Sequence, residues 1–156
     1  RWSPDGKKNA FIKMPDTETP FPLGELWLMN ADGKNARPLA PADAGHGYAA
    51  AWSPDSTRIA FVGRDNPNDP RADESAGALV SNIYLIETET GRTVSVTRFE
   101  GRLVESPAWS ADGHFLAFTV VTLNDTIEVW FADLASGAVM LLESRGPACC
   151  SGWMRK

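Results

Sequence analysis

The chain has 156 residues, of which 43% are hydrophobic and 22% charged, and its formal net charge is −5. This composition is typical of a folded domain with its own core and argues against wholesale disorder. The charges include no run of Lys and Arg that would fit a phosphate backbone, and no apolar stretch approaches the roughly 20 residues of a membrane span, so neither nucleic acid nor a bilayer is an expected partner.

The first predicted element is a repeated segment. The chain opens with RWSPDGKKNAF, and close relatives of it recur as AWSPDSTRIAF from Ala51 and AWSADGHFLAF from Ala108. The tryptophans of these copies and Trp153 in the C-terminal SGWMRK are spaced by 50, 57 and 44 residues. Spacings of this size are typical of the blades of a β-propeller, so the chain is predicted to repeat one supersecondary unit.

Each repeat contains the same elements in the same order. A short segment of small residues ends in Trp and is followed by a turn of the Ser-Pro-Asp-Gly type at 3–6, 53–56 and 110–113. An apolar run such as RIAFVG follows, then a strand such as ELWLMNADG that closes with a Gly reversal, and then a last strand such as TVSVTR. The turn residues favour a chain reversal, and no segment has convincing helical periodicity over three turns. The predicted fold class is all-β, with each repeat a four-stranded antiparallel meander.

A single meander with apolar residues on both faces cannot bury itself, so the sheets are expected to stack radially as propeller blades. The expected repeats are 1–48, 49–105 and 106–149, with the start of a fourth at 150–156. About three blades leave two apolar faces open. Two solutions follow: the chain is a fragment of a larger propeller, or a second copy pairs with it about a two-fold axis. We expect both at once, a fragment whose open faces are covered by a second copy.

The motif WSPDGKKxAF, followed by LWLMNADGKNARPL, resembles the repeat of TolB-type propellers, the WD-like WSPDG class. The chain departs from that pattern at Ser56, which replaces the turn Gly, and at Ala111, which replaces the turn Pro. The resemblance implies half of a six-bladed propeller, protein partners and a periplasmic or other extracytoplasmic location, and a second copy would then complete the ring. Similar blades also cover the hydrolase domain of prolyl-oligopeptidase-like serine peptidases.

The two ends of the expected blades differ in loop length. With the strands of a blade labelled A to D in chain order, the A-strand Trp and the C-strand aromatic are 25, 32 and 21 residues apart in the three repeats. The distance from that aromatic to the next Trp is nearly constant at 25, 25 and 23. Length variation therefore lies in the B–C loops. Because binding residues tend to lie on variable loops of a rigid scaffold, the end with the B–C loops and D–A links is the predicted functional face.

Nine candidate binding residues lie on this predicted face: Phe21, His46, Tyr48, Arg64, Asp65, Asp69, Arg71, Arg102 and Glu105. Phe21 lies between two prolines in a stiff apolar segment. The segment RDNPNDPRADE is rich in oxygen ligands but lacks the spacing of a calcium-binding EF-hand. Its prolines, Pro67 and Pro70, favour an extended, solvated loop.

The sequence contains no recognisable catalytic set. It has no Gly-x-Ser-x-Gly elbow and no phosphate-binding Gly-rich loop, and its two histidines, His46 and His114, are expected at opposite ends of the blades. Cys149 and Cys150 are adjacent and suggest no metal site. We therefore expect no enzyme activity, metal or cofactor. The predicted function is a non-catalytic protein-interaction scaffold of the TolB type that uses the B–C/D–A face. The alternative is the propeller portion of a prolyl-oligopeptidase-like peptidase, and small-ligand binding in the channel stays open.

Overall fold

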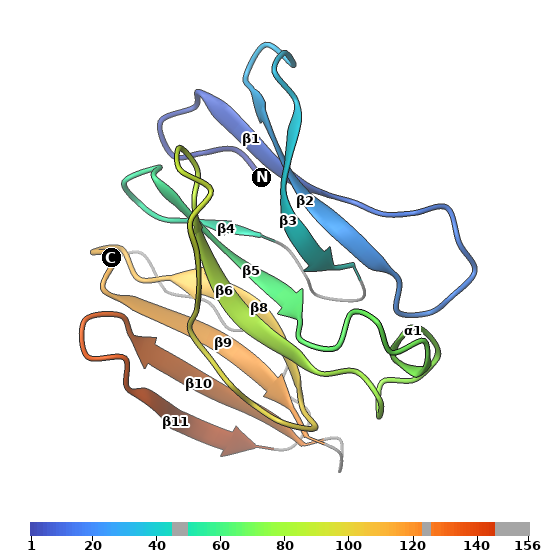
Figure 1. The fold of residues 1–156 in the computed structure, drawn as a ribbon. Coiled ribbons are helices and arrows are strands. Elements are labelled where there is room, and N and C mark those ends of the chain that lie inside the picture. Colours follow the sequence, from blue (N-terminus) through green and yellow to red (C-terminus); the bar gives the residue numbers. More distant parts are fainter. Residues whose placement is uncertain (45–49, 123–125, 146–156) are drawn as a thin grey trace.

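The computed structural model describes residues 1–44, 50–122 and 126–145, and it consists of three antiparallel sheets that lie against one another (Figure 1). The first sheet contains β1 (Lys8–Lys13), β2 (Leu23–Asn30) and β3 (Arg37–Asp43), and Trp2 forms a bridge to Asn9 beside β1. The second contains β4 (Ala51–Trp52), β5 (Arg58–Arg64), β6 (Ser81–Glu87) and β7 (Thr93–Ser95). The third contains β8 (Leu103–Trp109), β9 (Phe115–Val121), β10 (Ile127–Asp133) and β11 (Val139–Arg145).

Strands that follow one another in the chain are hydrogen-bonded neighbours in every sheet. Each sheet is thus a meander whose strands take the A, B, C and D places in chain order, with Trp2 in the A place of the first. The predicted all-β class and the predicted blade organisation are confirmed. No helix in the described part of the chain has the length and apolar character needed to cross a bilayer.

The Ser-Pro-Asp-Gly segments reverse the chain between strands A and B. In the second sheet the Ser53 hydroxyl donates to the Asp55 carboxylate at 2.5 Å and accepts from the backbone N–H of Arg58 at 2.9 Å. The other two turns repeat the Ser-to-Asp bond at 2.6 Å. The fourth turn position has a positive φ in all three copies, which explains why Gly occupies it twice and why Ser56, with φ of 62°, is the strained copy.

These turns predict how stability depends on pH. The pKa of Asp55 lies below its ordinary value of 3.8, chiefly because the Ser53 hydroxyl donates to the ionised carboxylate. A lowered native pKa stabilises the fold above the unfolded value, and this contribution is lost as pH falls through the native value. Replacing Ser53 with Ala should therefore lower the free energy of unfolding more at pH 7 than at pH 3. Urea denaturation at the two pH values measures the difference, and an equal loss at both would contradict it.

The core lies in two layers between the three sheets. The first layer, between the first and second sheets, includes Ala10, Leu26, Leu28, Trp52, Ile59, Phe61 and Ile86. The second, between the second and third sheets, includes Ala60, Val62, Ile83, Leu85, Val104, Trp109, Leu116, Phe118 and Val120. β5 supplies alternate residues to both layers, because successive side chains of a strand point to opposite faces. The apolar run RIAFVG is therefore a strand that is covered on both faces, as expected.

The repeated Trp of strand A joins each sheet to the one before it. The indole N–H of Trp52 donates to the backbone carbonyl of Arg1 at 3.0 Å, and that of Trp109 donates to the carbonyl of Ala51 at 2.9 Å. In both cases the acceptor is the residue that precedes the Trp of the previous sheet. A buried indole needs such a partner, so the repetition of Trp in the sequence follows from the repetition of this contact.

Candidate binding face

The loops that follow strand B lie at the end of the molecule where β5 ends and β6 begins. The second of them, residues 65–80, is the long insertion of the second repeat and carries α1 (Arg71–Glu74) (Figure 1). Pro70 precedes the helical turn, and Ala72 and Leu79 are almost completely buried. The expectation of an extended, solvated loop is therefore wrong. Pro fits well at the start of a helical turn, and the two apolar side chains draw the segment onto the protein.

Arg64, the last residue of β5, binds two loops and the end of β3 at this end of the molecule. Its Nη2 donates to the Phe21 carbonyl at 2.6 Å and to Asp43 Oδ1 at 2.8 Å, and its Nη1 donates to Asp73 Oδ1 at 2.5 Å. Phe21 belongs to the first B–C loop, Asp43 ends β3 and Asp73 lies in α1. The Phe21 N–H also donates to the Asp73 carbonyl at 3.1 Å. The predicted candidates Phe21 and Arg64 are thus brought together.

The Arg64 cluster is an enclosed electrostatic site. The side chains of Arg64 and Asp43 are fully buried, whereas the Asp73 side chain is 42% exposed. Burial raises the pKa of Asp43 above its ordinary range, and Arg64 opposes this shift. Among the described residues, Asp43 Oδ2 and Arg64 Nε have no hydrogen-bond partner. Arg64 therefore lies inside the face that it was predicted to line.

Asp65, the next candidate, binds two side chains of β6, one of which fixes the segment that follows β7. It accepts from the Tyr84 hydroxyl and, at 2.8 Å, from the Asn82 amide. The fully buried Asn82 also bonds the backbone N–H and carbonyl of Phe99 at 2.7 and 3.1 Å. Asn82 thus replaces ladder hydrogen bonds beyond the end of β7 at Ser95 and fixes the link to the third sheet.

The same network makes Tyr84 a reporter group. Burial and then the neighbouring Asp65 raise the pKa of Tyr84 to about 12. We predict that replacing Asp65 with Asn lowers this pKa, because it removes the adjacent negative charge. The phenolate absorbance of the chain, compared with that of a Tyr84→Phe variant, isolates this group, since the only other tyrosine is Tyr48. An unchanged Tyr84 titration in the Asn variant would disprove the assignment.

The raised pKa of Tyr84 also affects stability. The protonated Tyr84 hydroxyl contributes to the free energy of unfolding below pH 10, and this contribution is lost as pH rises towards 12.

Arg102 lies at a separate place, between the second and third sheets. Its Nη1 is 3.3 Å from Glu128 Oε2, and its guanidinium lies 5.6 Å from the centre of the Phe99 ring. Trp130 donates to the same Glu128 oxygen at 2.8 Å and packs edge-on against Phe99. The first sheet repeats the acid-to-Trp bond between Glu25 and Trp27 at 3.0 Å. The spacing Glu-x-Trp in GELW and IEVW was the sequence signal for Glu128, which the list of candidates omitted.

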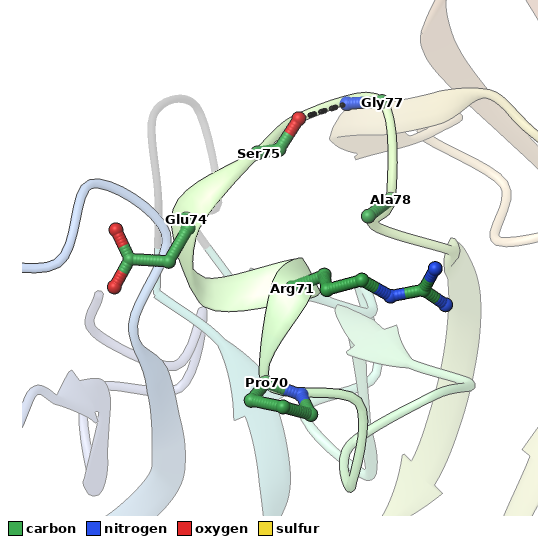
Figure 2. Close-up of a pocket in the computed structure, with 6 residues that line it drawn as sticks. All are labelled: Pro70, Arg71, Glu74, Ser75, Gly77 and Ala78. Atoms are coloured by element: carbon green, nitrogen blue, oxygen red, sulfur yellow. Dashed lines mark hydrogen bonds between the residues drawn. The ribbon is translucent and has the colours of Figure 1, made fainter.

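Asp69 and Arg71 pair with each other on the surface of the insertion. Arg71 Nε and Nη2 reach the two oxygens of Asp69 at 3.0 and 2.8 Å, and both groups are solvent-accessible. Arg71 also borders an open hollow of about 550 Å³ in the insertion (Figure 2). The other residues that line it are Pro70, Glu74, Ser75, Gly77 and Ala78. Figure 2 shows the charged groups of Arg71 and Glu74 pointing away from each other, so no single ligand group is flanked by both charges.

The remaining candidates complete the comparison with the sequence. Glu105 is half-buried in β8, whereas His46 and Tyr48 lie outside the described residues, as do both cysteines. Asp43 and Asp73 were not singled out from sequence, although they are the carboxylates that bind Arg64. Within residues 1–44, 50–122 and 126–145, no group of three or more His, Cys, Asp or Glu side chains is placed to hold a metal ion.

Comparisons with known proteins agree with the blade architecture. No family model matches the chain. The uncharacterized peptidase YuxL of Bacillus subtilis is 31% identical over 86 residues, which are 55% of this chain and 12% of that protein. TolB from Acinetobacter baumannii superposes with a TM-score of 0.63 at 23% identity, over 88% of this chain and 31% of TolB. A prolyl endopeptidase superposes with a TM-score of 0.71 at 21% identity, over 93% of this chain and 21% of that enzyme.

These likenesses establish the fold. The three sheets are blades of the propeller type that occurs both in TolB and in peptidase propeller domains. The matched residues span only 12% of YuxL and 9% of a second curated relative, dipeptidyl-peptidase 5 of Porphyromonas gingivalis.

Proposed function

We propose that the chain, which forms three consecutive TolB-like propeller blades, is a non-catalytic binding module. Its B–C/D–A face would contact a protein partner. The observation that carries this proposal is the Arg64 cluster, which fixes two B–C loops and the end of β3, from two blades, against one another. Loops that are fixed in this way form a preorganised surface, which lowers the entropic cost of binding. Arg71, whose side chain is 80% exposed and pairs with the partly buried Asp69, then supplies an accessible charge on that surface.

Site-specific cross-linking tests the proposed face. A photoreactive residue at position 71 should capture a partner from the native extract. One at position 114, which follows an A–B turn at the other end of the blades, should capture none. Equal capture from both positions, or capture from position 114 alone, would overturn the assignment of the face.

A second candidate function is supported by the peptidase matches. Under this alternative, residues 1–156 are the propeller portion of a prolyl-oligopeptidase-like serine peptidase, whose catalytic residues lie in another part of the protein. The amino-acid sequence of the full-length protein separates the two proposals. A Gly-x-Ser-x-Gly elbow followed by Asp and His, together with labelling of the full-length protein by a serine-directed fluorophosphonate, favours the peptidase. A full-length sequence with about six such repeats and no Gly-x-Ser-x-Gly elbow favours the scaffold.

The outer faces of the first and third sheets carry exposed apolar side chains. Trp2 is 57% exposed, and Met140, whose chain neighbour Val139 packs against the second core layer, is 45% exposed on the opposite face of β11. We propose that further blades cover these faces, supplied either by a larger propeller or by a second copy that completes a six-bladed ring. Sedimentation of residues 1–156 distinguishes the two sources. A species of twice the 16.9 kDa chain mass supports the second copy, and a stable monomer excludes it.

A further inference from the structure

We propose that Arg64 is the receptor for a carboxylate of the bound partner, and that Asp73 occupies this receptor as a displaceable internal substitute when the partner is absent. The proposal rests on the proposed binding face and specifies the partner chemistry that this face recognises. It starts from the unequal settings of the two carboxylates that Arg64 binds.

Asp43 is the permanent counterion of Arg64. Both side chains are fully buried and joined at 2.8 Å, and Asp43 belongs to β3 of the first sheet. A buried guanidinium requires an anion close to it, because an unpaired charge in this setting is strongly destabilising. Asp43 satisfies this requirement whether or not a second carboxylate is present.

Asp73 has the properties of a replaceable ligand. Its side chain is 42% exposed, so its carboxylate already keeps part of its hydration and loses little when it turns into solvent. The insertion does not depend on this contact for its closure. The Asp65 N–H donates to the Val80 carbonyl at 2.8 Å, and the Asn66 side chain bonds the backbone of Ala78 and Val80 at 2.8 and 3.0 Å. Rotation of the Asp73 side chain alone would free Arg64 Nη1, while the base of the loop stays closed.

The vacated position suits a monoanionic carboxylate. The vacated donor is Arg64 Nη1, which can donate a charge-assisted hydrogen bond to a carboxylate oxygen as it does to Asp73. The negative charge of the adjacent Asp43 would repel a dianion such as phosphate more strongly than a monoanion. The expected ligand group is therefore a peptide carboxylate, at a C-terminus or on an acidic side chain.

The internal substitute also sets the expected affinity. A tethered group competes at an effective concentration in the millimolar range or above, so a free carboxylate should bind the unaltered chain weakly. Removing the Asp73 carboxylate should strengthen binding of free carboxylates at least 10-fold.

Thermal denaturation with small anions tests the proposal. Asp73→Ala should melt at a lower temperature than the unaltered chain, and acetate or formate should restore its melting temperature, whereas chloride at equal ionic strength should not. Asp69→Ala removes an acidic side chain of the same insertion that does not contact Arg64, so it serves as the matched control and should not respond to acetate. A response of equal size in the unaltered chain, the control and Asp73→Ala, or no response in Asp73→Ala, would overturn the proposal.

A direct measurement locates the bound anion. In Asp73→Ala with ¹⁵N-labelled arginine, acetate should shift the side-chain resonances of Arg64 and leave those of Arg71 unchanged. This readout does not require an Arg64 variant, which would also be destabilised by the loss of its pair with Asp43. Shifts spread over all arginines would contradict a site at Arg64.

Peptides then distinguish the two sources of the carboxylate. An acetylated alanine peptide with a free C-terminus and an amidated one with an internal Glu are titrated against Asp73→Ala, with the amidated alanine peptide as the uncharged control. Binding of either charged peptide, without binding of the control, supports the receptor and identifies the source. If neither binds while position 71 still captures a partner, the carboxylate receptor is wrong and the proposed face stands. If acetate binds at Arg64 but position 71 captures nothing, the receptor exists and the proposed face is wrong.

Discussion

Replacing Arg64 with Met is expected to lower the free energy of unfolding by about 3 to 5 kcal/mol, because it leaves the buried Asp43 carboxylate without its cation. The substitution also removes the hydrogen bonds to Phe21 and Asp73, which leaves the Phe21 N–H to Asp73 carbonyl bond as the remaining direct hydrogen bond between these loops. Urea denaturation followed by tryptophan fluorescence measures the loss. Arg71→Met is the matched control, since Arg71 is exposed and its pair with Asp69 should be worth under about 1 kcal/mol.

The loss in Arg64→Met should also depend on pH. Without Arg64 the pKa of Asp43 should be raised further above its ordinary value, because burial already raises it and the opposing cation is gone. A group with a raised native carboxyl pKa loses stability as pH rises above the unfolded value of 3.8. The cost of the substitution should therefore be larger at pH 7 than at pH 4. A similar loss in Arg64→Met and Arg71→Met, or a cost that is larger at pH 4, would show that the ion pair does not stabilise the fold.

Replacing Phe118 with Ala is expected to lower the free energy of unfolding by about 3 to 5 kcal/mol, since the substitution opens a cavity between the second and third sheets. Phe118 is fully buried and packs edge-on against Phe99, with 6.2 Å between the ring centres. The same denaturation experiment measures the effect.

Phe115→Ala is the control for this prediction. Phe115 lies in the same strand but is only partly buried, and it packs against Phe131 rather than in the layer that contains Phe118. Its substitution should cost less than half as much. Equal losses at the two positions would mean that the main core is not the layer between the sheets.

The fold was predictable because the signals for it are local and repeated. The turns with Ser and Asp two residues apart, the apolar runs and the strands that close with Gly are each encoded within about ten residues, and each occurs three times. The recurrence of Trp at positions 52 and 109 also predicted a repeated contact, but it did not identify the hydrogen-bond acceptor of the indole. The acceptor is a backbone carbonyl more than 50 residues away, which no side chain identifies.

The candidate face was predictable only in part. The loop-length argument selected the end of the blades and named Phe21 and Arg64, which the structure joins. It did not show that Arg64 is enclosed, because its burial depends on Asp43 of the preceding sheet and on Asp73 of the insertion. A charged residue beside a loop gives the same local pattern whether it is solvated or paired across a sheet boundary. The helical turn of the insertion was missed because Pro67 and Pro70 were taken as evidence for extended chain.

The Trp contacts have a consequence for how such a chain could change in length. The indoles of Trp52 and Trp109 both donate to the preceding sheet, and neither donates to the following one. These contacts between successive sheets therefore run in one direction along the chain. A whole repeat inserted or deleted in the same orientation would meet the same donor and acceptor at both new junctions. Duplication of one genetic unit would therefore lengthen the array without any new surface having to evolve, whereas a reversed unit would find no acceptor for its indole.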